Sequence, residues 1–73
     1  MNTKKTLITQ LDKIKSISTD EEWLVFVLAY YERLSILEIS YILNKTSTYI
    51  NNVLDNVLNK AIPILGSNIS LLT

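Results

Sequence analysis

The side chains best suited to specific polar recognition belong to one short segment. Its asparagines occupy positions 51, 52, 56 and 59, and Tyr49 precedes them. An Asn amide both donates and accepts hydrogen bonds, and it can pair with the edge of an adenine through two of them. The same composition is also typical of a solvated helix face in a proteome rich in Asn, Lys and Ile. The segment therefore indicates either a neutral surface that contacts DNA or protein, or a face that meets water.

Two sets of carboxylates raise the question of acid–base catalysis. Glu21 and Glu22 are adjacent, and Glu32 and Glu38 follow further along the chain. Paired carboxylates can act as a general acid and a general base. However, Glu21, Glu22 and Glu38 each stand three residues after a Ser or Thr, which is the spacing of a helix capping box. Capping accounts for these acids, and we expect no enzyme.

Other kinds of chemistry are excluded by the residue inventory. The chain has no Cys and no His, which removes thiolate nucleophiles, disulfides, zinc fingers and histidine bases. Its single Gly cannot form a phosphate-binding glycine loop. We therefore expect no metal, no cofactor and no small-molecule substrate. Because a small secreted fold would normally need disulfides, a cytoplasmic location is the natural expectation.

Length and charge limit the remaining possibilities. The 73 residues form one small domain with a modest core, so self-association would help its stability. The longest apolar run, residues 23–31, is too short to span a bilayer, and no long apolar stretch follows Lys4 and Lys5 as in a signal peptide. We expect no membrane partner. The net charge is zero, but residues 1–15 are basic, either as a solvated helix face or as an arm that contacts phosphate.

Hydrophobic periodicity predicts two helices in the first half of the chain. Leu7, Leu11 and Ile14 recur at helical spacing and predict an amphipathic helix over residues 4–16. Ser18 or Thr19 then caps a second helix that continues to residue 33. Because this second helix is apolar nearly all round, we expect it in the centre of the domain.

Two further helices are predicted in the second half. Ser35 caps a short helix over residues 36–43, and Asn44 ends it in a left-handed conformation. The segment 46–48 caps a longer helix over residues 48–61, which we expect Pro63 to stop. The short helix presents three residues to the core, Ile39, Ile42 and Leu43. The longer helix presents six, Ile50, Val53, Leu54, Val57, Leu58 and Ala61.

The second half of the chain resembles a known family. Residues 34–50, LSILEISYILNKTSTYI, are similar to the helix-turn-helix of bacterial sigma-factor region 4, whose usual form is close to LSYEEIAEILGISxSTVK. Upstream, residues 25–33, VFVLAYYER, are similar to VFLLRYYEG, and the resemblance covers residues 20–60. The LuxR-like helix-turn-helix of response regulators has nearly the same pattern, and the Tyr30-Tyr31 pair favours the sigma-like family.

The resemblance implies an all-α, four-helix, helix-turn-helix domain of the sigma region 4 type. Residues 1–18 would be an added amphipathic helix, residues 19–63 the helix-turn-helix core and residues 64–73 an apolar tail. It also implies a small transcription regulator, because the second helix of such a motif enters the major groove of DNA. The implied DNA contacts are Lys45, Ser47, Thr48, Tyr49, Asn51, Asn52 and Asn56.

This sequence departs from the family pattern in its charges. The positions where the family places basic residues are Asn51, Val53 and Asn56 here. Phosphate neutralisation normally supplies much of the affinity for DNA. The resemblance therefore implies weak DNA binding, by a homodimer or together with RNA polymerase or a sigma-related protein.

A second departure indicates an alternative function. Five positions that are usually charged in the family carry apolar or aromatic residues, Trp23, Leu24, Leu37, Tyr41 and Val53. Exposed apolar clusters usually mark a partner surface, although Trp23 and Leu24 could instead pack on the N-terminal helix. The alternative is a non-catalytic interaction or dimerisation module that kept the fold but lost its DNA contacts.

Overall fold

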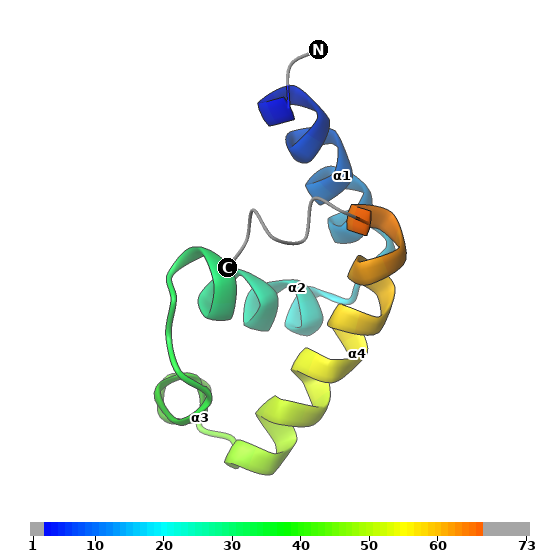
Figure 1. Cartoon of the computed structure of the whole chain (residues 1–73). Helices are drawn as coiled ribbons and strands as arrows, with labels where there is room; N and C mark the ends of the chain where they lie inside the picture. The colour runs from blue at the N-terminus through cyan, green and yellow to red at the C-terminus, as the bar shows by residue number, and fades with distance from the viewer. Residues whose placement is uncertain (1–2, 67–73) are drawn as a thin grey trace.

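The computed structural model of the chain describes residues 3–66, and this part is all-helical, without strands (Figure 1). The elements in order are α1 (Thr3–Ile17), α2 (Asp20–Phe26), the π-helical turn η1 (Val27–Tyr31), α3 (Ile36–Leu43) and α4 (Ser47–Leu65). The predicted all-α class and four α-helices are confirmed for these residues. None of these helices is long and apolar enough to cross a membrane. Residues 67–73, the main part of the predicted apolar tail, lie outside the described residues.

The start of α2 is fixed by the predicted capping box. Thr19 Oγ1 accepts a hydrogen bond from the Glu22 backbone N at 3.1 Å, and Glu22 Oε1 accepts one from the Thr19 backbone N at 2.9 Å. Thr19 is therefore the cap. Ser18 instead donates its hydroxyl to the Ile14 carbonyl at 2.7 Å, near the end of α1.

The second predicted helix does not stay α-helical to Arg33. The Glu32 backbone N bonds the Val27 carbonyl at 3.0 Å, a five-residue spacing that defines the π-helical turn η1. The chain then reverses through Arg33, whose φ of 58° is left-handed. The expected central position holds for α2, which buries Val25 and Phe26, but no residue of η1 is buried.

α3 and α4 begin and meet as predicted. Ser35 Oγ accepts from the Glu38 backbone N at 3.1 Å, and Glu38 Oε1 accepts from the Ser35 backbone N at 3.0 Å. Asn44 ends α3 with a φ of 55°. Thr46 Oγ1 then caps α4 by accepting from the Tyr49 backbone N at 3.0 Å.

α4 continues through Pro63 to Leu65, so the expected stop at Pro63 was wrong. A proline inside a helix removes one backbone hydrogen bond and costs about 3 kcal/mol. Here the Gly66 backbone N bonds the Ile62 carbonyl beyond the proline. Leu65 is 2% exposed and packs with Ile14 and Phe26, and burying such a side chain contributes roughly 1.5–3 kcal/mol. This burial offsets much of the proline penalty.

Two groups of buried residues lie along α4. The N-terminal core joins α1 and α2 to the second half of α4 and contains Ile14, Phe26, Val57, Ala61 and Leu65. The second core joins α2 and α3 to the first half and contains Val25, Ile39, Ile50 and Val53. Leu54 packs against both. The predicted core position of Ile42 was wrong, because α3 turns it outward and leaves it 60% exposed.

Candidate functional site

The connection between α3 and α4 sets the direction in which α4 projects. The Lys45 backbone N bonds the Ser40 carbonyl at 3.0 Å, directly after the left-handed Asn44. Ile39 and Ile50, both fully buried, pack the two helices together across this connection. The first turns of α4 therefore stand at one end of the molecule, beside α3, while α1 lies beside the other end of α4 (Figure 1).

A continuous set of polar residues covers the outer side of these first turns. We call this set the amide face; its members are Ser47, Thr48, Asn51, Asn52, Asp55 and Asn56. All six are exposed. Within residues 3–66 their side chains form no hydrogen bond with one another or with the rest of the chain. Their donors and acceptors are therefore available to a partner.

The charges beside the amide face nearly cancel. Lys45 lies over the Tyr49 ring, with Nζ 5.1 Å from the ring centroid. The Tyr49 hydroxyl donates to Glu21 Oε1 at 2.5 Å, and this bond raises the pKa of Tyr49. With Asp55 on the face itself, one cation stands against two anions. The basic first helix packs at the opposite end of α4, away from the amide face (Figure 1).

Tyr49, one of the seven residues predicted to contact DNA, is less available for such a contact than expected. It is 40% exposed, and its hydroxyl is occupied by Glu21. Sequence reasoning gave Glu21 only a capping role, and the residue lies 28 positions from Tyr49 in the chain. No local pattern connects two residues that far apart, so the contact had no signal in the sequence.

The five predicted interface residues fall in different places. Leu37 and Tyr41 are 58% and 79% exposed on α3, and Ile42, which was not predicted there, joins them. We call these three the α3 apolar face. Val53 is only 8% exposed, because it follows Ile50 by three residues and faces the second core, so it offers no interface.

The two predicted interface residues on α2 lie apart from the α3 apolar face. Trp23 is half-buried and stacks on Phe26, with the ring centroids 5.6 Å apart. Leu24, the next residue, remains 43% exposed.

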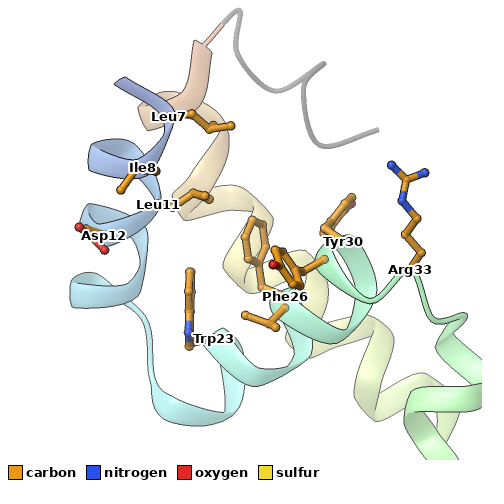
Figure 2. A pocket seen from close by; sticks show the side chains of 10 residues that line it. Leu7, Ile8, Leu11, Asp12, Trp23, Phe26, Tyr30 and Arg33 are labelled. Carbon is orange, nitrogen blue, oxygen red and sulfur yellow. The ribbon is translucent and has the colours of Figure 1, made fainter. Parts of the chain in front are cut away.

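Trp23 lines a hollow that the sequence did not predict. This hollow, the α1–η1 groove, has a volume of about 600 Å³. One wall comes from α1 and the other from α2 and η1, with Asp12 and Arg33 at its margins (Figure 2). The lining is otherwise apolar or aromatic, Leu7, Ile8, Leu11, Trp23, Phe26, Val27, Tyr30 and Tyr31. Val27, Tyr30 and Tyr31 of this lining belong to the π-helical turn η1, which no sequence pattern predicted.

The described residues thus define a small all-α domain with an exposed amide face, an α3 apolar face and an apolar groove. Within residues 3–66, no cluster of three or more acids is placed to hold a metal ion. Comparison of the chain with models of protein families, with curated proteins and with solved structures gave no match.

Proposed function

We propose that this chain is a small, non-catalytic transcription regulator that binds DNA through a helix-turn-helix. α3 and α4 are the two helices of the motif, and the amide face on α4 contacts base edges in the major groove. The observation that carries the proposal is that the six side chains of this face are all exposed and make no hydrogen bond within residues 3–66. The resemblance of residues 20–60 to sigma-factor region 4 supports the same function.

The charges predict how such binding behaves. Asn side chains favour adenine, since one amide can bond both N6 and N7. Lys45 is the one basic residue between Leu34 and Asn59, so few phosphates are neutralised. The observed affinity should therefore depend only weakly on salt, since the slope scales with the number of phosphate contacts. Useful affinity then requires two motifs in a dimer, or a partner such as RNA polymerase.

The test is binding of the full chain to a random duplex library, followed by titration of the selected sequences. We expect enrichment of adenine-containing sites. Replacing Asn51, Asn52 and Asn56 together by Ala should lower the affinity for the selected site by at least about tenfold, because one bidentate pair alone contributes roughly 1–3 kcal/mol of discrimination. Asn59→Ala is the matched control, being exposed on the same side of α4 but one turn beyond Asn56. No selection above background, or equal loss in the control, contradicts the proposal.

The α3 apolar face favours a second candidate function, a module that binds another copy of itself. Leu37, Tyr41 and Ile42 are all more than half exposed, and the chain has no net charge to keep two copies apart. When two α3 helices pair antiparallel, Glu38 at the start of one approaches Lys45 just beyond the end of the other. Apolar contact and opposite charges thus both fit a second copy.

Sedimentation of the full chain tests this second candidate. The wild-type chain should form a dimer that Tyr41→Lys converts to a monomer. Ile62→Lys, an equally drastic change at a 51% exposed residue on another part of the surface, should leave the dimer intact. A wild-type chain that stays monomeric at high concentration excludes this function, and DNA binding would then require a partner such as RNA polymerase.

A further inference from the structure

We propose that the α1–η1 groove binds the C-terminal segment of this same chain, residues 67–73. This inference is independent of DNA binding. The groove is open along an apolar surface, where Ile8 is 51% exposed and Tyr31 is 82% exposed. An apolar segment that covers this exposed apolar surface removes it from water, which stabilises the folded protein.

The point where α4 ends places this segment beside the groove. Gln10 Nε2 on α1 donates a hydrogen bond to the Ile64 carbonyl at 3.0 Å. Gln10 lies between Leu7 and Leu11 in sequence, and both leucines line the groove (Figure 2). Leu65 packs in the same core as Phe26, which also lines the groove. The segment after Gly66 therefore begins at the edge of the groove.

Gly66 allows the backbone to turn away from the axis of α4. Its φ is 52° and its ψ is −126°, a combination that side chains disfavour and glycine tolerates. No atom lies within 4 Å of where a Cβ would stand, so the requirement for glycine is conformational and not steric. The backbone thus turns at the residue that precedes the segment.

The composition and length of residues 67–73 suit this groove. The segment, SNISLLT, contains Ile69, Leu71 and Leu72 and no charged side chain. Apolar side chains complement the lining, and the absence of charge avoids burying an unpaired ion against it. Seven extended residues reach up to roughly 23–25 Å, which is comparable to the length of the whole of α1 at 1.5 Å per residue.

Trp23 provides a direct readout, because it is the one tryptophan of the chain and lines the groove. In the full chain we expect its emission at short wavelength and its shielding from an aqueous quencher. Replacing Ile69, Leu71 and Leu72 together by Ser should shift the emission to longer wavelength and increase quenching. Ile62→Ser, which removes an exposed apolar side chain outside the groove, should change neither. Unchanged Trp23 emission in the triple variant, with the helical circular dichroism retained, overturns the proposal.

A spin label identifies what occupies the groove. The chain has no Cys, so Ser70→Cys gives a single attachment point in the segment. We expect the label to broaden the methyl signals of Leu7, Ile8 and Leu11 equally at low and high protein concentration. Ile8→Lys should relieve the broadening at Leu7 and Leu11. Broadening that increases with protein concentration means that a second copy occupies the groove. Signals that are not broadened mean that the segment does not bind there. Either result overturns the proposal.

Discussion

Glu22 Oε1 lies 2.6 Å from Lys60 Nζ and 2.9 Å from the Thr19 backbone N, so one carboxylate oxygen both caps α2 and holds α4. Glu22 is 9% exposed, whereas the Lys60 side chain is 37% exposed. The pair therefore links the start of α2 to the second half of α4 at the boundary of the N-terminal core. Its contribution to stability can be measured separately from that of the apolar packing.

Replacing this carboxylate should weaken the fold. Glu22→Gln removes the ion pair and leaves Lys60 with a neutral partner. We expect the free energy of unfolding in urea to fall by about 1 kcal/mol, a modest value because solvent screens the half-exposed lysine. Glu38→Gln is the control, since Glu38 caps α3 in the same way but forms no ion pair with a lysine within residues 3–66. An equal loss in the two variants shows that Lys60 contributes nothing.

The same carboxylate should make stability depend on acid pH. The Lys60 hydrogen bond, and then the bond from the Thr19 backbone, hold the pKa of Glu22 below its ordinary value of 4.5. A folded-state pKa that is depressed contributes stability above the unfolded-state pKa, and this stability is lost as the pH falls through the folded-state pKa. Unfolding measured across pH 2–6 should therefore show a decline that begins near the ordinary value of 4.5 and continues below it.

Glu22→Gln identifies the source of this decline. The variant should show a shallower decline, because the ion pair no longer titrates. Part of the slope should remain, since the Ser35 backbone bond also lowers the pKa of Glu38. A variant that follows the wild-type slope throughout refutes the assignment to Glu22.

Asn44 should tolerate Gly better than Ala. Its φ of 55° is left-handed, which costs a side chain with a Cβ about 1–2 kcal/mol unless local polar bonding compensates. Asn44→Gly should retain or slightly raise the melting temperature, whereas Asn44→Ala should lower the free energy of unfolding by about 1 kcal/mol. Because Asn44 is exposed, neither change alters packing. Identical stabilities of the two variants argue against the left-handed turn.

Glu21→Gln should strengthen DNA binding, if the amide face contacts DNA as proposed. The change removes a negative charge beside the first turn of α4, where Glu21 accepts the bond from Tyr49. At low salt we expect an affinity gain of roughly two- to threefold, and the gain should shrink at higher salt as screening increases. Asp12→Asn, which removes a charge from α1, is the matched control. Equal gains in both variants indicate only a change in net charge.

The sequence predicted the starts of α2 and α3 and the end of α3 because these depend on residues close together in the chain. Thr19 with Glu22, Ser35 with Glu38, and Asn44 each act within one turn of helix, and each took the predicted conformation. The six-residue stripe of α4 was also correctly placed toward the cores. Periodicity and capping together therefore define most of the helical scaffold.

The features that the sequence did not predict depend on tertiary packing. The continuation of α4 past Pro63 is favoured by burial of Leu65 in one core with Ile14, which brings together the last turns of α4 and α1. The π-helical turn, three of whose residues line the groove, has no residue signature. Val53 depends on tertiary packing in the same way. An apolar residue on α4 can face either a core or an interface, and the position of α2 decides between them.

The two cores along α4 also bear on how such a chain can evolve. A helix of 19 residues is about 28 Å long, so its amide face and the end that packs on α1 are well separated. Leu54 is the residue that contacts both cores. Substitutions that rewrite the outer surface at the start of α4 can therefore accumulate without disturbing the packing around Ile14 and Leu65. Such separation allows a lineage to gain, exchange or lose a binding partner at one end while inheriting the same scaffold.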